Sequence, residues 1–322
     1  MILDIVVPHY NEPYEVGKPL FDMLAMQRGV DFSQIRVILV HDGSGFFPDD
    51  LFAGLPYKVE QHRIAHKGVS AARNFGMDIA NAKWITFCDF DDCYVDMYAL
   101  KLIMDALETD DFDLLWNPIY MEDYVDDRFV VYPLIKFNMI FIHNKYFRTD
   151  FLNKVKLRFN ESLSYSEDTA FLAILNVILE QKRIGKIGSP SPLYTWSYRP
   201  GSCTTEDANK LRNMEHLFES NKYISREFTR LKYEDAGLMK FRAICDVYVA
   251  ATSKGAPKCD DLLRKVTQYW VQNKTEISCQ KKESLQKVID CCVGNKKIAG
   301  KKTDRPSLAV WLNNMEQKYL KG

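Results

Sequence analysis

The fold is decided by one stretch of the sequence, Trp84-Ile85-Thr86-Phe87-Cys88-Asp89-Phe90-Asp91-Asp92. Its first part predicts a buried strand, because a short continuous apolar run is typical of the interior of a sheet. The run ends abruptly in three carboxylates within four residues. Carboxylates crowded at one strand end repel one another, so a divalent cation or a set of hydrogen-bond donors is expected among them. A solvated acidic turn is the alternative.

The whole chain has the composition of an ordinary globular protein. Its 322 residues, 47% hydrophobic and 27% charged, allow a sizeable core and two or three domains or subdomains. The eight cysteines are irregularly spaced and include no Cys-x-x-Cys, so neither a zinc site nor a disulfide framework is indicated. The N-terminus lacks the basic flank of a signal peptide, and no apolar stretch is long enough to span a bilayer. We therefore expect a soluble, cytoplasmic protein with reduced thiols.

The net charge of zero conceals two oppositely charged segments. Residues 89–127 hold thirteen acidic residues against the single basic Lys101, and residues 281–305 hold eight basic residues against three acidic ones. The acidic segment suits a cation. The basic segment could meet an anionic partner such as a phosphate-bearing polymer, nucleic acid or a membrane surface. A solvated helix face that keeps the protein soluble is the alternative for residues 281–305.

Two further apolar runs are followed at once by polar residues. Residues 2–7 form a β-branched run that Pro8 is expected to stop, and polar residues 10–12 come directly after it. Residues 35–40 lead into a glycine-containing turn in which Asp42 could accept hydrogen bonds from a nucleobase or a ribose. Open α/β sheets bind ligands at the carboxyl ends of their strands, so these loops are expected to form a binding edge.

A helix rich in small residues is predicted after a third strand over residues 57–61. Arg73 in this helix could pair with a phosphate or with a strand-end carboxylate, since a guanidinium fork suits both partners. Another amphipathic helix is expected over residues 97–107. Residues 114–142 are expected to form strands and hairpin-like connections. Their tyrosines could stack on a sugar or serve only to pack the sheet.

Four motifs occur in order along the first third of the chain. They are Val6-Val7-Pro8-His9-Tyr10-Asn11-Glu12, Asp42-Gly43-Ser44, Gly68-Val69-Ser70-Ala71-Ala72-Arg73-Asn74-Phe75-Gly76 and Phe87-Cys88-Asp89-Phe90-Asp91-Asp92. In this order and spacing they resemble the family 2 glycosyltransferases of GT-A fold. Three residues depart from the family pattern. His41 stands where the family usually has a further Asp, and Cys88 and Phe90 replace the commoner Leu and Ser.

Two later motifs extend the resemblance to about residue 202. The first is Ser166-Glu167-Asp168-Thr169-Ala170-Phe171, and the second is the aromatic closing segment that contains Arg199. The resemblance implies that Asp168, beside Glu167, is the catalytic base. The alternative is a carboxylate that only interacts with the dipole of the helix it opens. No histidine lies in the closing segment, where some relatives have a metal ligand.

The resemblance implies an inverting transfer of a hexosyl or N-acetylhexosaminyl group from a nucleotide sugar, with UDP as the expected nucleotide, to an acceptor hydroxyl. Asp42 and Tyr10 would hold the nucleobase, Asp89 the ribose or the metal, and Asp91 the Mn²⁺ or Mg²⁺. The expected donor contacts are Pro8, Tyr10, Asn11, Glu12, Asp42, Arg73, Asp89, Phe90 and Arg199. The acceptor, whether glycan, other polymer, protein or nucleic acid, is not indicated.

Two domains are expected. Residues 1–202 would form a GT-A α/β domain with a mostly parallel, Rossmann-like sheet, divided into a nucleotide-sugar half (1–115) and an acceptor half (116–202). Residues 203–322 show apolar residues at helical spacing, which predicts a helical region with a core or a homo-oligomer surface. One alternative function is a nucleotidyltransferase, although no Gly-rich phosphate loop lies near the N-terminus. The other is an inactive sugar-nucleotide or glycan binding module, which the retention of Asp91 and Asp168 disfavours.

Overall fold

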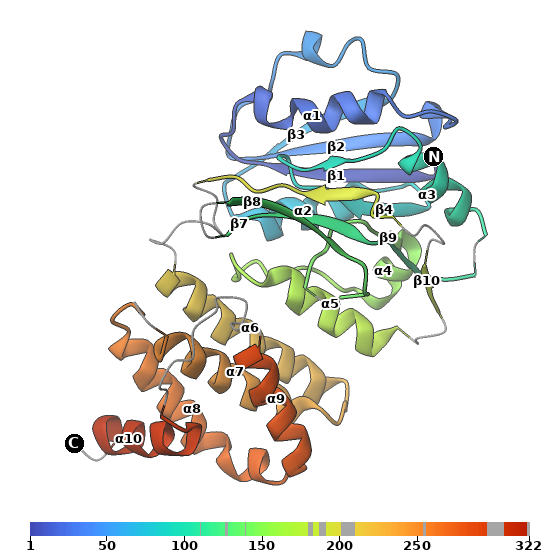
Figure 1. The fold of residues 1–322 in the computed structure, drawn as a ribbon. Helices are drawn as coiled ribbons and strands as arrows, with labels where there is room; N and C mark the ends of the chain where they lie inside the picture. Colours follow the sequence, from blue (N-terminus) through green and yellow to red (C-terminus); the bar gives the residue numbers. More distant parts are fainter. Residues whose placement is uncertain are drawn as a thin grey trace. The chain divides into compact units, whose positions relative to one another are not determined.

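A seven-stranded sheet forms the centre of the N-terminal part of the chain in the computed structural model (Figure 1). The chain divides into two compact units, Met1–Pro200 and Gly201–Gly322. The structure describes residues 1–109, 111–125, 128–138, 140–179, 183–186, 191–200, 210–253, 256–294 and 306–320.

The central sheet is mostly parallel, as the sequence predicts. Its strands in spatial order are β10 (Ile184–Lys186), β6 (Leu114–Trp116), β9 (Lys145–Arg148), β4 (Trp84–Phe87), β1 (Leu3–His9), β2 (Ile35–Asp42) and β3 (Lys58–Ile64). β9 runs antiparallel to both of its neighbours, whereas the other neighbouring pairs are parallel. The strand ends of β1, β2 and β4 therefore meet at one edge, where the polar motifs follow them.

Helices cover both faces of this sheet. α1 (Tyr14–Ala25) and α3 (Ala99–Leu107) contribute to the same apolar core as Leu3 and Ile5 of β1. α2 (Val69–Ile79) packs on the opposite face, where a Cβ on Gly76 would come within 2.4 Å of Val6. The small residues of α2 thus allow close contact with the sheet. α5 (Glu167–Ile178) joins this second layer through the Phe171 ring, and α4 (Thr149–Val155) directly follows β9.

A second sheet of four strands carries the closing segment to the acidic strand end. Its order is β5 (Cys93–Tyr94), β11 (Tyr194–Trp196), β7 (Ile119–Val125) and β8 (Arg128–Leu134). β11 is antiparallel to β5 and parallel to β7, and β7 pairs with β8 as a hairpin. Since β5 follows Asp92 directly, this pairing brings the residues after β11 beside the carboxylates. Among the described connections are two one-turn 3₁₀ helices, Phe32–Gln34 and Asp49–Leu51.

The expectation that Pro8 stops the first strand is wrong. β1 continues through Pro8 to His9, and both residues pair in register with β2. β4 ends at Phe87, opposite Val6. Backbone groups alternate between the two sides of a strand, so the side on which Pro8 lacks an N–H faces the position where β4 has already ended. The proline therefore costs no hydrogen bond of the sheet.

The C-terminal unit is helical, as predicted. Its helices are α6 (Lys210–Arg230), α7 (Ala236–Ala251), α8 (Asp260–Ser278), α9 (Lys282–Gly294) and α10 (Leu308–Leu320). The apolar stripes of these helices form a core of their own, which includes Phe218, Ile244, Val266 and Trp311. An oligomer surface on these helices stays a prediction. α9 covers the first part of the basic stretch, and residues 295–305 lie outside the described residues.

The described residues also show the state of the thiols and the apolar length of the helices. Each cysteine that the structure describes has a free thiol. Across the described ranges, no helix is both long enough and apolar enough to cross a membrane.

Candidate active site

Arg73 holds three carboxylates together at the binding edge of the sheet. Its Nη1 donates to Glu167 Oε1 at 2.9 Å and to Asp168 Oδ1 at 2.6 Å, and its Nη2 donates to Asp89 Oδ1 at 2.9 Å. The Arg73 side chain is only 2% exposed, so these ion pairs are little screened by solvent. Burial opposes the charge, but the carboxylates outweigh it and raise the pKa of Arg73 above its ordinary value. Of the two partners expected for Arg73, the structure shows the carboxylates.

Glu167 is the member of this cluster with a raised pKa. Burial and the charge of Asp168 raise the pKa of Glu167 from 4.5 to about 7, against the opposing effect of Arg73. The folded protein therefore keeps a proton that the unfolded chain releases. This stabilisation is fully present below about pH 4.5 and is lost as the pH rises through about 7.

We expect Glu167→Gln to be more stable than the wild type at about pH 8, by up to about 3 kcal/mol, and equally stable at about pH 4.5. Urea unfolding at the two pH values measures the difference. The control is Glu161→Gln, which removes an exposed carboxylate that accepts a hydrogen bond from Asn74. No gain is expected there, because water solvates the charge. A difference between wild type and Glu167→Gln that does not change with pH would contradict this prediction.

His143 lies against the second oxygen of Asp89. Its Nε2 donates to Asp89 Oδ2 at 2.9 Å and lies 3.7 Å from Asp92 Oδ2. Burial alone would lower the pKa of His143, but Asp89 and Asp92 together raise it to about 9. Burial alone would raise the pKa of Asp89, but His143 and Arg73 hold it below its usual range. Asp89 is thus an ionised carboxylate between two cations.

Asp92 forms the buried floor of the acidic motif. Its carboxylate accepts hydrogen bonds from the Tyr194 hydroxyl at 3.0 Å and from the Ser197 N–H at 2.7 Å. Burial raises the pKa of Asp92 well above its usual range. Within the described part of the chain, Asp89, Asp92 and His143 form a group whose ligand atoms lie within 4.8 Å of one another, close enough to hold a metal ion.

Asp91 lies at the more open side of the motif. Arg199 Nε donates to Asp91 Oδ2 at 2.6 Å, and Arg199 Nη2 donates to Glu12 Oε1 at 3.2 Å. The Arg199 side chain is 37% exposed, so this arginine can be reached by a ligand. Burial and the charge of Asp89 raise the pKa of Asp91, although Arg199 opposes them. A second cation near Asp89 and Asp91 would relieve this repulsion.

Asp42 shapes the loop that precedes α2. One carboxylate oxygen accepts the Lys67 N–H at 2.8 Å, and the other accepts the Gly68 N–H and His66 Nδ1, each at 2.8 Å. Gly68 has a φ of 95°, a conformation that glycine adopts without strain. The Tyr10 ring stacks on the His66 ring, with centroids 4.1 Å apart, and is 47% exposed. Tyr10 therefore offers an open aromatic face, whereas the Asp42 carboxylate is already engaged.

Three described residues other than glycine, Asn11, Asn144 and Ser166, adopt positive φ angles at this edge. Asn11 has a φ of 62°, and its N–H donates to Ser44 Oγ at 3.2 Å. Ser166 has a φ of 63° and directly precedes the first turn of α5. Such conformations cost about 1 to 3 kcal/mol and are common where a loop must take one particular shape. The loops after β1 and before α5 are therefore held in place by their surroundings.

The contacts link most of the predicted site residues to one another. Glu12, Arg199 and Asp91 form one chain of ion pairs, and Asp89, Arg73, Glu167 and Asp168 form another. Phe90, one of the expected donor contacts, belongs to neither chain. Its ring is 4% exposed and packs on His9 and Phe47, so it lies in the core.

Sequence reasoning missed His143 as a partner of the acidic motif. His143 comes from the segment just before β9, more than fifty positions after Asp89. A lone histidine between Ile142 and Asn144 carries no pattern that predicts its partner. Only the antiparallel insertion of β9 beside β4 places it there.

The chain is similar to known glycosyltransferases in sequence and in fold. The sequence model of the family described as Glycosyl transferase family 2 matches residues 4–163. The chain is 27% identical over 241 residues to the uncharacterized glycosyltransferase EpsJ of Bacillus subtilis, a match that covers 67% of this chain and 66% of EpsJ. Residues 1–349 of S. aureus TarS give a TM-score of 0.62 at 17% identity, over 98% of this chain and 88% of that one. The mannosyltransferase PcManGT of Pyrobaculum calidifontis, in complex with GDP-Man and Mn²⁺, gives 0.52 at 13% identity, over 93% and 88%.

The chain belongs to the family 2 glycosyltransferases. The likeness to TarS and PcManGT is distant in sequence and shows the fold, which is the GT-A fold. The family and the fold expected from the motifs are thereby confirmed. The chain spans 66% of the length of EpsJ.

Proposed function

We propose that this chain transfers a sugar from a UDP-sugar to an acceptor hydroxyl with inversion of the anomeric centre. The observation that carries the proposal is the Arg73 guanidinium, which bonds Asp168 and Asp89 at the same time. Arg73 thereby fixes the position of the Asp168 carboxylate, which can accept a proton, relative to the end of β4, where the donor is expected to bind. Crystal structures of TarS with UDP and with UDP-GlcNAc support a UDP-sugar as the donor.

Asp168 takes the role of general base. Arg73 holds its Oδ1, and the Ile142 N–H donates to its Oδ2 at 3.2 Å, so the carboxylate has one orientation. As the acceptor oxygen forms its bond to the anomeric carbon, the bond from that carbon to the diphosphate breaks and the hydroxyl proton passes to Asp168. A single displacement of this kind inverts the anomeric centre. Glu167, tied to the same guanidinium and buried, positions Arg73.

The donor nucleotide lies against the loops after β1 and β2 in this proposal. The open face of Tyr10 stacks on the nucleobase, and Asp42 keeps residues 66–68 in the shape that supports Tyr10. Arg199 is exposed enough to exchange its contact with Asp91 for the diphosphate. Pro8 and Asn11 set the course of the backbone beneath the donor.

A divalent cation fits the exposed side of the acidic motif. Asp89 and Asp91 are the more accessible carboxylates, with side chains 29% and 21% exposed, whereas Asp92 is 1% exposed. Burial, and after it the like charge of Asp89, raises the pKa of Asp91. We assign the cation, Mn²⁺ or Mg²⁺, to Asp89 and Asp91, with His143 and Asp92 behind them. When bound, such an ion supplies positive charge to the leaving diphosphate.

Calorimetric titration of UDP, UDP-GlcNAc and GDP-Man, with and without Mn²⁺, tests this proposal. We expect Mn²⁺-dependent binding of the uridine ligands that is lost in Asp91→Asn and kept in Asp92→Asn. The two variants are matched, since each replaces one carboxylate of the same motif by an amide. If Mn²⁺-dependent binding is lost in Asp92→Asn alone, the ion is instead held by the group of Asp89, Asp92 and His143. Binding of GDP-Man alone would contradict a uridine donor, and no binding at all would contradict the proposed function.

In this proposal, residues 116–200 bind the acceptor. The β7–β8 hairpin presents exposed aromatic rings at Tyr124, Phe129 and Tyr132, which could stack on a sugar acceptor. An anionic partner at residues 281–305 stays a prediction.

A further inference from the structure

Two buried histidines meet where β1 and β2 end. His9 and His41 are paired in the register of these strands and are 4% and 0% exposed. Their Nδ1 atoms lie 2.9 Å apart, which is a hydrogen-bond distance. Such a bond needs a proton on one of the two nitrogens. The protons on the outer nitrogens therefore decide the charge of the pair.

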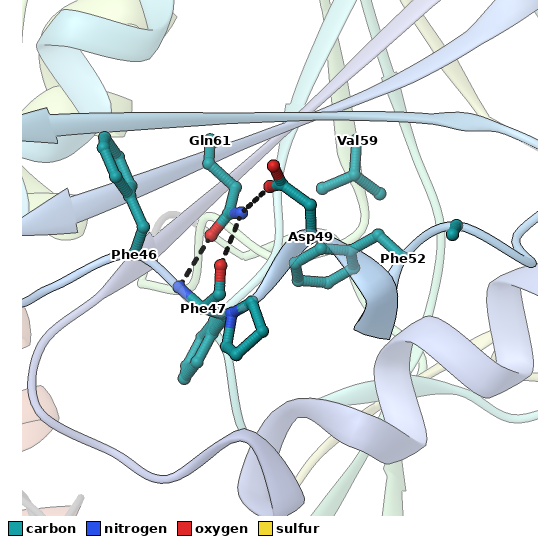
Figure 2. A pocket seen from close by; sticks show the side chains of 8 residues that line it. Phe46, Phe47, Asp49, Phe52, Val59 and Gln61 are labelled. Atoms are coloured by element: carbon teal, nitrogen blue, oxygen red, sulfur yellow. Dashed lines mark hydrogen bonds between the residues drawn. The ribbon is translucent and has the colours of Figure 1, made fainter.

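The outer nitrogen of His41 must carry a proton. His41 Nε2 lies 3.0 Å from Gln61 Oε1, and that oxygen also accepts the Phe47 N–H at 3.0 Å. Gln61 Nε2 donates to the Phe47 carbonyl at 3.0 Å and to Asp49 Oδ1 at 3.1 Å, as Figure 2 shows. Exchanging the oxygen and nitrogen of the Gln61 amide would turn its contacts with the Phe47 N–H, the Phe47 carbonyl and the Asp49 carboxylate into repulsions. Gln61 Oε1 is thus fixed as an acceptor, and His41 Nε2 donates to it.

These contacts lie on the wall of a surface pocket of about 680 Å³ beside β3. Phe47, Asp49 and Gln61 are among the residues that line it (Figure 2). Gln61 thus has one end at the pocket and the other at the histidine pair. Phe47 and Asp49 in the loop that lines the pocket hold the Gln61 amide in one orientation.

The outer nitrogen of His9 must carry a proton as well. His9 Nε2 lies 2.8 Å from the backbone carbonyl oxygen of Glu12, and a carbonyl only accepts. If both histidines were neutral, their two Nδ1 lone pairs would face each other at 2.9 Å with no proton between them. Ser44 Oγ, 3.4 Å from His9 Nδ1, could donate to that nitrogen but would not remove the repulsion. A third proton removes it and gives the pair one positive charge.

The surroundings assign this charge to His9. Burial lowers the pKa of His41 to about 4, so His41 is the neutral partner. The His9 ring lies 4.7 Å from the Phe47 ring and 4.7 Å from the Phe90 ring, and aromatic faces attract cations. Its Nε2 also lies 4.0 Å from Glu12 Oε2. The buried Phe90 ring thus packs against this cation.

We propose that His9 is an imidazolium, which donates from Nδ1 to His41 and from Nε2 to the Glu12 carbonyl, and that this buried charge positions the Tyr10–Glu12 loop for the donor. The charge of the pair follows from the hydrogen bonds and its assignment to His9 from the surroundings, whereas the positioning role rests on the proposed function. Glu12 also bonds Arg199, which bonds Asp91, so the loop connects His9 with the expected diphosphate site. His9 touches no reacting atom and is a positioning residue.

The other charged groups around the pair are few. Glu12, from the loop after β1, favours the charged form, and Arg63, the register partner of His41 on β3, opposes it. Asp49 acts at one remove through Gln61, and Asp42 follows His41 on β2 with its carboxylate bonded to His66. As the pH rises, the pair loses its third proton. Either the bond from His9 Nε2 to the Glu12 carbonyl or the bond between the two rings is then lost.

Nuclear magnetic resonance of the ring nitrogens tests the charge without any ligand. In ¹⁵N-histidine-labelled protein at about pH 6.5, we expect His9 to show two protonated nitrogens and His41 a proton on Nε2 only. The signals are assigned by His9→Gln and His41→Asn. A single protonated nitrogen on His9 across about pH 6 to 8 would overturn the proposed charge.

Binding of UDP tests the positioning role. His41→Asp and His41→Asn are matched in size, and only the aspartate introduces a negative charge, which holds the His9 proton. For the wild type we expect the UDP dissociation constant to rise roughly tenfold between about pH 6 and pH 9. The rise should be roughly threefold or less in His41→Asp, while His41→Asn should bind about tenfold more weakly already at about pH 6. Comparing the proteins at each pH cancels the titration of UDP itself.

Equal pH dependence in the three proteins would overturn the positioning role. A wild type that binds no UDP at any pH would overturn the proposed function and this role together. The nitrogen signals of His9 would still decide the charge in that case.

Discussion

Asp168→Asn is expected to lower the turnover number by about 10² to 10⁴. The dissociation constant of the UDP-sugar should stay close to that of the wild type. The amide keeps an oxygen for Arg73, so the ion pairs of Arg73 with Asp89 and Glu167 remain, but the amide cannot accept the acceptor proton. Release of UDP in the presence of acceptor measures turnover, and calorimetry measures donor binding.

Asp78→Asn is the matched control for this substitution. Asp78 bonds Arg158 at 2.9 Å, and its side chain is 60% exposed on α2, away from the contacts of the site. Its replacement should leave both turnover and donor binding unchanged. Turnover near the wild-type value in Asp168→Asn would remove Asp168 from the role of base. A parallel loss of donor binding would instead make it a residue of the donor site.

Arg73→Met is expected to lower the free energy of unfolding by about 3 to 5 kcal/mol and to abolish donor binding. The substitution keeps a long apolar side chain but leaves three carboxylates without their shared cation, two of them on the first turn of α5. The loss of stability should shrink at about pH 4, since the carboxylates can then be neutralised by protons. Chemical unfolding at two pH values measures it.

Arg36→Met separates stability from function in this comparison. Arg36 is also buried and bonds Asp4 through two nitrogens at 2.9 Å and 2.8 Å, and it bonds Glu60 as well. Its loss should destabilise the protein to a similar degree but leave UDP binding intact at temperatures where the variant is folded. Weaker UDP binding in Arg36→Met, equal to that in Arg73→Met, would contradict a specific role of Arg73 in the site.

The strands and the acidic edge could be predicted because their signals are local. The apolar run 84–87 and the carboxylates after it are adjacent in sequence, and the same holds for β1 and β2 with their loops. Strand ends of a parallel sheet meet at one edge, so the sequence indicates where these residues gather. The first turn of α5 with Glu167 and Asp168 was predictable for the same reason.

The partners of these residues could not be predicted because they come from distant elements. Pairing of Asp89 with His143 depends on β9 entering the sheet antiparallel beside β4. Similarly, the bond between His9 and His41 depends on the register of β1 against β2, since a shift by one residue would separate the two rings. Arg73 had two plausible partners in the sequence, and burial decides between them because a phosphate cannot reach a side chain that is 2% exposed.

The ion pairs of Arg73 also bear on how the protein is made on the ribosome. Asp89 lies 16 positions after Arg73, but Glu167 and Asp168 lie 94 and 95 positions after it. At typical elongation rates, about 5 to 20 s pass between the synthesis of the arginine and that of its last partners. The interval is longer still for Asp92, because its partners Tyr194 and Ser197 follow it by 102 and 105 positions. A nascent or truncated chain that ends near residue 115 carries Arg73 with Asp89 but lacks the other groups that balance the donor-side acids, among them His143 and Arg199. We therefore expect it to depend on chaperones rather than fold as a nucleotide-binding fragment.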